Sequence, residues 1–188
     1  MAGDAYGTLL RTMATTGQGR TSVRVNVLGT GTASVETGVS VLDHLLALLA
    51  EHASFDLVLE VEPGTAEAEI AGAAHAFGEA LAEPLRAEGV RGHGSAVVPA
   101  DEALAHVALE ASGRPLVVSN VDLSQARVAG LSNDLAARFL DELAQSAGLT
   151  LHVRLIEGSE TQHVLESIFK ALGVALAQAI RPRRTVER

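Results

Sequence analysis

A histidine and a glutamate three residues apart begin the last long apolar segment of the chain. In Gln162-His163-Val164-Leu165-Glu166 the imidazole and the carboxylate stand at positions i and i+3, so a helix would present both on one face. Both groups bind divalent metals, and this spacing supplies half of a metal site. The alternative is a solvated polar face where a helix begins. Because the sequence contains no cysteine, any metal must be held by His, Asp or Glu.

Two further histidines are candidates for the same chemistry. His44 follows Asp43 at the start of a predicted helix, where an Asp-His pair is either a cap or a metal ligand with its orienting carboxylate. His152 stands between Leu151 and Val153 in a predicted strand, so its side chain points to the face opposite to these apolar neighbours. On local grounds an exposed strand histidine is the favoured interpretation of His152.

Two cations stand out as candidate phosphate contacts. Thirteen of the fourteen basic residues are arginines, and Lys170 is the single lysine, which suggests a need for its compact ammonium group. The turn Ser112-Gly113-Arg114-Pro115 presents an arginine, and a guanidinium in a tight turn can bind a phosphate. A surface salt bridge is the alternative for Arg114, and locally it is favoured.

The composition limits the classes of protein that need consideration. With 188 residues and 47% hydrophobic content, the chain can form one compact unit with a substantial core. A net charge of −9 gives no overall attraction to nucleic acid or to an anionic membrane. The first residues lack the pattern of a secretory signal, and no apolar stretch approaches the roughly 20 residues that span a bilayer. We therefore expect a soluble, cytoplasmic protein.

The hydrophobic pattern predicts an alternation of strands and helices. Polar and apolar residues alternate, as in half-buried strands, over 22–28, 55–61, 104–109, 115–121 and 149–155. Apolar residues recur at helical spacing over 41–53, 66–88, 135–147 and 161–180. Glycine-rich turns are predicted at 29–31 and 89–94.

The two halves of the chain can be aligned on each other. The strand 55–61 falls on 149–155 with an offset of 94, and Phe77-Gly78 falls on Leu172-Gly173 with an offset of 95. This predicts a duplicated α/β architecture in one domain, 1–188, made of repeats at about 20–90 and 95–182. Sheets covered on one face by helices would bury such repeats, and equivalent sites would be related by a pseudo-twofold axis.

Four stretches together resemble the imidazoleglycerol-phosphate dehydratase family, over about residues 23 to 181. They are TGVSVLDHLL from Thr37, PADEAL from Pro99, VALEASGRP from Val107, and LTLHVRLIEG from Leu149, which leads to Phe169-Lys170-Ala171. The resemblance implies an α+β fold of the ribosomal protein S5 domain 2-like type, with two half-domains that each have a mostly antiparallel sheet and two helices on one face. It also implies dehydration of imidazole glycerol phosphate to imidazole acetol phosphate with two manganese ions. Family members form homo-oligomeric shells of 24 subunits whose sites are completed between subunits.

The resemblance further implies a set of metal ligands, of which only part is present. His44 and the strand histidine His152 match ligand positions. A His-His-x-x-Glu motif of the second half falls on Gln162, His163 and Glu166, so one histidine is lost.

In the first half the same motif falls on Glu67, Ala68 and Ala71, in agreement with the internal offset of 95. Four of eight ligand positions therefore keep the family residue, and Glu67 could supply a fifth.

More of the family's phosphate-binding positions than of its metal-ligand positions keep a suitable residue in this chain. Arg114 and Lys170 match two of them, while a third falls near Gly92, where the adjacent Arg91 is the substitute. A functional glutamate of the family falls near Gln18.

These losses predict a dehydratase homologue with reduced or lost activity. Loss of a ligand or of its outer-shell partner costs about ten- to a hundredfold in affinity or activity. Two alternatives stay open: a non-catalytic paralogue that assembles with itself or with an active relative, and a sensor that binds a phosphorylated small molecule without chemistry.

Overall fold

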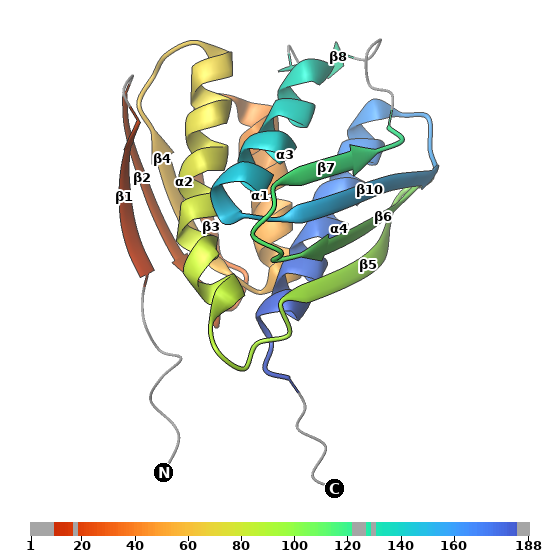
Figure 1. Ribbon diagram of the computed structural model, residues 1–188. Coiled ribbons are helices and arrows are strands. Elements are labelled where there is room, and N and C mark those ends of the chain that lie inside the picture. Colours follow the sequence, from red (N-terminus) through yellow and green to blue (C-terminus); the bar gives the residue numbers. More distant parts are fainter. Residues whose placement is uncertain (1–9, 17–18, 122–126, 129–130, 184–188) are drawn as a thin grey trace, which may run out of the picture.

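The computed structural model describes residues 10–16, 19–121, 127–128 and 131–183, with side chains described over 21–121 and 136–183 (Figure 1). The first half contains β1 (Leu10–Thr16), β2 (Gly19–Asn26), β3 (Ala33–Glu36), α1 (Ser40–Ala53), β4 (Asp56–Val61) and α2 (Ala66–Arg86). The second half contains β5 (His93–Ala100), β6 (Ala103–Glu110), β7 (Leu116–Ser119), β8 (Arg127–Val128), β9 (Leu131–Ser132), α3 (Asn133–Ala147), β10 (Thr150–Glu157) and α4 (Thr161–Ile180).

The two large sheets have the same topology. The first sheet has the order β1-β2-β4-β3 and the second the order β5-β6-β10-β7. In each sheet the first three strands are antiparallel and the last strand pairs parallel with its neighbour. Strands β8 and β9 pair in a separate two-stranded antiparallel sheet. The predicted class, an α+β fold with mostly antiparallel sheets, is confirmed; the repeat boundaries at about 20–90 and 95–182 stay a prediction.

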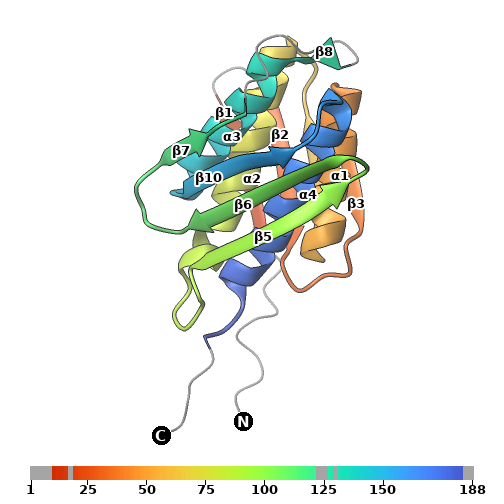
Figure 2. The ribbon, with the colours of Figure 1, turned by 90° about the vertical axis from the view of Figure 1, so that its right-hand side faces the viewer.

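The four long helices lie between the two sheets (Figures 1 and 2). α1 and α2 pack on the first sheet, α3 and α4 pack on the second, and the layers meet where α1 contacts α4 and α2 contacts α3. The parallel strands β3 and β4 are each followed by a helix, so α1 and α2 begin at the same end of their sheet. This arrangement brings the start of α1 beside that of α4 and the start of α2 beside that of α3.

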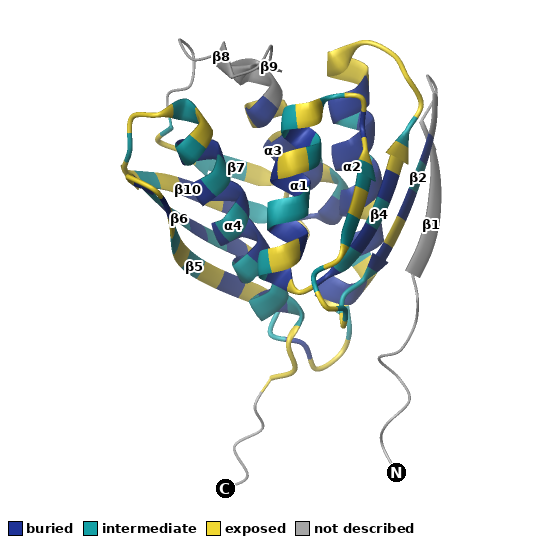
Figure 3. Ribbon diagram, turned by 180° about the vertical axis from the view of Figure 1, so that it is seen from behind, coloured by how far each residue is buried: buried dark blue, intermediate teal, exposed yellow. Residues whose placement is uncertain are grey.

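Period-two alternation explains how the sheets bury one face. Leu57 and Leu59 of β4 are buried, as are Leu151 and Val153 of β10, while the residues between them are more exposed (Figure 3). Helices complete the core with apolar stripes, and Phe139 of α3 meets Phe169 of α4 with ring centroids 5.4 Å apart.

Glycines allow close approach where helices pack tightly. A Cβ atom added to Gly173 of α4 would collide with the carbonyl oxygen of Leu49 in α1. The equivalent residue of the first half, Gly78 of α2, faces the hydroxyl of Ser146 in α3. Both positions therefore favour glycine, but a methyl group would meet backbone first at Gly173 and a side-chain hydroxyl first at Gly78.

The sequence pattern missed β1, β3 and β5. β5 contains Gly94 and Pro99 and overlaps the glycine-rich turn that was predicted at 89–94. Gly94 stands there because a Cβ atom would collide with the carbonyl oxygen of Ala175, where the strand crosses α4. Close packing against a helix, rather than a turn, is the reason for this glycine.

The length and apolar character of α4 correct one further expectation. Thr161–Ile180 is long and apolar enough to cross a membrane by length and composition, and it is the one such helix among the described residues. However, 61% of this segment is buried inside the protein, as expected of a core helix.

Candidate functional site

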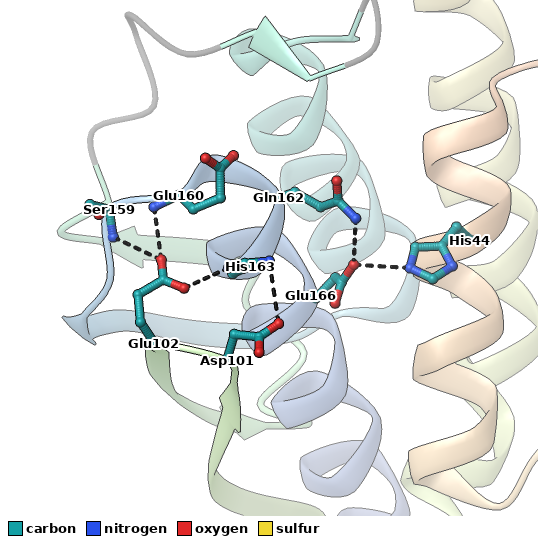
Figure 4. A network of polar contacts seen from close by, with 8 residues as sticks. All are labelled: His44, Asp101, Glu102, Ser159, Glu160, Gln162, His163 and Glu166. Atoms are coloured by element: carbon teal, nitrogen blue, oxygen red, sulfur yellow. Dashed lines mark hydrogen bonds and ion pairs between the residues drawn. The ribbon is translucent and has the colours of Figure 1, made fainter.

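His44 and Glu166 meet across the contact between α1 and α4. His44 Nε2 lies 3.1 Å from Glu166 Oε1 (Figure 4). The His44 side chain is 52% exposed and the Glu166 side chain only 15%. Asp43 does not contact this pair; it accepts hydrogen bonds from the backbone N–H and the hydroxyl of Thr37 at 2.9 and 2.6 Å. Asp43 therefore fixes the loop before α1, which favours the structural role over that of an orienting carboxylate.

Glu166 is held as an anion by its neighbours. Gln162 Nε2 donates to the same Oε1 atom at 3.0 Å. Burial raises the pKa of the Glu166 carboxyl, but the hydrogen bonds from Gln162 and His44 and the charges of His44 and Lys170 outweigh burial, so the pKa lies below its ordinary value. Gln162, at a position where the family resemblance implies a histidine, thus stabilises the Glu166 carboxylate.

His163 lies one turn away and is held on both sides of its ring. Its Nδ1 atom is 2.5 Å from Glu102 Oε2, and its Nε2 atom is 3.3 Å from Asp101 Oδ2 (Figure 4). Glu102 is itself fixed, because its Oε1 atom accepts the backbone N–H of Glu160 at 2.9 Å. A carboxylate on Nδ1 is the usual way to orient an imidazole whose Nε2 atom binds a metal.

The same contacts shift two pKa values in opposite directions. The Glu160 N–H and then the His163 ring lower the pKa of Glu102 to about 2. The hydrogen bond that His163 donates to Glu102 raises the pKa of His163, and the charges of Glu102, Asp101 and Glu166 add to this effect against burial.

We expect the Glu102→Gln substitution to bring the pKa of His163 back toward 6.5. Stability from Glu102 is present above about pH 4.5 and is lost as the pH falls toward 2, while stability from His163 is present below about pH 6.5 and is lost as the pH rises through its raised pKa. The wild type and the Glu102→Gln variant should therefore differ most in free energy of unfolding between about pH 4.5 and pH 6.5.

NMR titration of the imidazole C–H signals would give the pKa, and urea unfolding at several pH values would give the stability profile. Asp101→Asn is the matched control and should shift the His163 pKa less, since Asp101 makes a smaller contribution. An unchanged His163 pKa in Glu102→Gln would contradict the assignment.

The first half of the chain does not carry an equivalent pair. Glu67 has a 71% exposed side chain, and its Oε2 atom lies 3.3 Å from Arg138 Nη1, which links α2 to α3. The offset of 94 places His44 on Arg138, and the offset of 95 places Glu67 on Gln162, so an arginine stands where the other half has His44. A guanidinium cannot donate a lone pair to a metal. With Ala68 and Ala71 nearby, these residues do not fit a divalent cation.

His152 does not join His163 and Glu166 within one chain. It is exposed on β10, on the face opposite to Leu151 and Val153, whereas α4 packs on the buried face. Among the described residues, no three His, Asp or Glu side chains are placed to hold one metal ion. His44 is paired with Glu166, whereas His163 contacts Glu102 and Asp101, so these residues would hold a metal only if another subunit added ligands.

The three candidate phosphate contacts are also spread out. Lys170 lies one turn after Glu166 on α4, and Arg114 lies in the exposed turn after β6, where Ser112 Oγ accepts the Arg114 N–H at 3.1 Å. The backbone N–H of Arg91 donates to the carbonyl of Arg181, at the far end of α4. About 11 residues of helix, or roughly 16 Å, separate Lys170 from that end. Gln18 lies outside the described residues.

Sequence reasoning missed the roles of Asp101, Glu102 and Arg138. The Asp-Glu pair lies within a stretch that carried the family resemblance, but its contact with His163 joins residues 61 positions apart and needs the tertiary structure. Arg138 could have been found, because the internal offset pairs it with His44.

Comparison with known proteins agrees with this architecture. The family model for imidazoleglycerol-phosphate dehydratase matches residues 37–176. The chain is 41% identical over 185 residues to the imidazoleglycerol-phosphate dehydratase of Syntrophobacter fumaroxidans, covering 96% of this chain and 92% of the relative. It is 36% identical over 162 residues to that of an Exiguobacterium species, covering 84% and 83%.

Solved structures give the same result. The crystal structure of imidazoleglycerol-phosphate dehydratase from Staphylococcus aureus superposes with a TM-score of 0.83 at 28% identity, covering 92% of this chain and 99% of that one. The enzyme from Pyrococcus furiosus, in complex with (S)-C348, gives 0.82 at 27% identity, covering 94% and 97%. This chain belongs to the imidazoleglycerol-phosphate dehydratase family.

Proposed function

We propose that this protein binds imidazole glycerol phosphate but dehydrates it slowly or not at all. The observation that carries the proposal is Arg138, which stands where the other helix pair has His44 and forms an ion pair with Glu67. A guanidinium at this position pairs with the Glu67 carboxylate and repels a divalent metal. Of the two equivalent places, where α1 meets α4 and where α2 meets α3, the second is thus unsuited to metal binding.

The remaining residues support partial function. Manganese, if bound, would supply Lewis-acid polarisation and a template for the substrate. His44, His163 and Glu166 would hold it, Glu102 would orient His163, and the phosphate would be attracted by the cations Lys170 and Arg114.

We further propose that the working form is a cytoplasmic homo-oligomer. His152 lies on an outer sheet face, so it can approach a metal bound near His163 only from another copy of the chain. The shells of 24 subunits expected from the family would provide such contacts. Because Arg91 lies at the far end of α4, it too would reach a substrate at Lys170 only from a second copy.

A ligand-binding role without catalysis is the second candidate. It is favoured by the retention of Lys170 and Arg114 beside the loss of the metal-binding residues at 68, 71 and 162. Such a protein would act as a sensor or as a partner of an active relative.

Complementation and binding measurements test the proposal together. The chain, produced in a bacterium that lacks its own dehydratase, should support little or no growth without histidine, whereas an intact relative should restore growth. Isothermal titration should still detect binding of imidazole glycerol phosphate, weakened in Lys170→Gln. Full growth would contradict reduced catalysis, and absence of binding by the folded wild-type protein would contradict the proposed ligand.

A further inference from the structure

Ser95 and His106 form a hydrogen-bonded pair on the outer face of the second sheet. Ser95 Oγ lies 2.7 Å from His106 Nε2, and both residues stand on the sheet face that the helices leave uncovered (Figure 2). Val97 of β5 is opposite His106 of β6, so Ser95, two residues before Val97, is the diagonal neighbour of His106 on the same face. The pair includes none of the residues assigned above to a metal or to a phosphate.

The contact gives the two side chains distinct chemical roles. When the neutral imidazole of His106 carries its proton on Nδ1, the Ser95 hydroxyl donates to Nε2. His106 is then placed to take up the hydroxyl proton, which activates the serine oxygen as a nucleophile. The backbone of Ser95 is also fixed, because its N–H donates to Gln178 Oε1 of α4 at 3.1 Å.

Two neighbours on the same face extend this pair toward a reaction site. Arg154 of β10 is directly opposite His106, and it is exposed. Directly opposite residues have Cβ atoms about 4.5–5.5 Å apart, so the long arginine side chain can bring positive charge to an oxyanion that forms beside the pair. Val97, on the other side of His106, is 52% exposed and offers an apolar surface to a short acyl chain.

A structural role alone leaves the exposure of the pair unexplained. β5 and β6 are paired along their whole length, from His93 opposite Glu110 to Ala100 opposite Ala103, so their register does not depend on a side-chain bond. Ser95 is exposed, so its hydroxyl could bond to water equally well. An accessible serine oxygen that is bonded to an imidazole is the arrangement that nucleophilic chemistry needs.

We propose that Ser95 accepts an acyl group from a small activated carboxylic ester, with His106 as its general base. Ser95 Oγ forms a bond to the carbonyl carbon, the bond from that carbon to the leaving oxygen breaks, and the hydroxyl proton passes through His106 Nε2 to the leaving group. Among the described side chains, no carboxylate pairs with His106, so the third member of a triad is missing. The acyl group should therefore accumulate on Ser95 rather than turn over rapidly. Because none of these residues belongs to the proposed dehydratase site, either proposal can fail without the other.

Reaction of the full chain with p-nitrophenyl acetate tests the proposal. EDTA is present, so that a bound metal cannot supply a hydroxide. We expect a burst of about one p-nitrophenolate per chain, with one acetyl group on the peptide that contains Ser95, found by mass spectrometry. Ser95→Ala should abolish the burst, and His106→Gln should slow it by about a hundredfold or more. Ser34→Ala removes an exposed serine from the first sheet and should leave the burst unchanged. Circular dichroism would check that each variant is folded.

The position of the acetyl group and the rates of the variants decide the outcome. Acetylation of Ser95 that depends on His106 supports the site, and a slower burst in Arg154→Gln would support the contact of the guanidinium with the oxyanion. An acetyl group on Lys170 or on a histidine instead of Ser95 would overturn the proposal. A wild-type rate in His106→Gln, or no burst by the folded wild type, would also overturn it.

Discussion

Replacing Gln162 by histidine is expected to raise the affinity of the protein for manganese by about ten- to a hundredfold. The substitution completes the His-His-x-x-Glu motif of the second half beside His163 and Glu166. Gln162 Nε2 now donates to Glu166 Oε1 at 3.0 Å, so this side chain already lies at the carboxylate that a metal would share. An imidazole there exchanges a weak amide ligand for a strong one.

The affinity can be followed by electron paramagnetic resonance of free manganese in the presence of the protein. Gln162→Ala is the control, because it removes the amide without adding a ligand and should give no gain. The matching change in the first half, Ala68→His with Ala71→Glu, should help less while Arg138 remains, and more when Arg138→His is added. If Gln162→His did not raise the affinity for manganese, the assignment of His163 and Glu166 as the surviving half-site would be contradicted.

The Gly173→Ala substitution is expected to lower the free energy of unfolding by about 1–3 kcal/mol through overpacking. The added methyl group would meet the Leu49 carbonyl and the Ala53 N–H of α1, which are backbone atoms of a packed helix and cannot rotate away. The gain of about 1 kcal/mol in helix propensity on replacing glycine by alanine offsets only part of this cost.

Urea unfolding of two matched variants isolates the cause. Gly78→Ala occupies the equivalent crossing of α2 and α3, where rotation can move the nearest atom, the Ser146 hydroxyl. The Ser146 Cβ and the Ala147 N, 2.9 and 3.1 Å from the added carbon, cannot rotate away but are less close than the Leu49 carbonyl oxygen at 2.3 Å from Gly173, so Gly78→Ala should be destabilised less. Gly64→Ala has its nearest neighbour, the Ala68 side chain, 4.0 Å away and should change stability little. If Gly173→Ala were as stable as the wild type, the close approach of α1 and α4 at Gly173 would be contradicted.

The sequence predicted the elements that follow a regular pattern. β4 and β10 alternate strictly because each buries one face, and the four helices carry continuous apolar stripes, so their periods are visible in the residues. β3 has only four residues, and β5 contains a glycine and a proline required by its packing on α4, so neither has a readable period.

The candidate site shows a similar limit. Helical spacing placed His163 and Glu166 one turn apart on α4, which is a local relation, but in the structure their side chains contact different partners. The strand pattern also indicated that His152 points away from the apolar face, and the structure shows it exposed there, apart from His163. Contacts such as His163 with Glu102 and Glu67 with Arg138 depend on how distant segments pack, and no local pattern predicts them.

The most direct test of reduced catalysis is the turnover of imidazole glycerol phosphate with added manganese. The protein should be purified from a host without its own dehydratase and compared with a relative that has both His-His-x-x-Glu motifs intact. With ligand positions lost in both halves, we expect turnover at least about a hundredfold below that of the relative. Turnover equal to that of the relative, and abolished by His163→Ala, would show that the remaining residues suffice and would contradict the account.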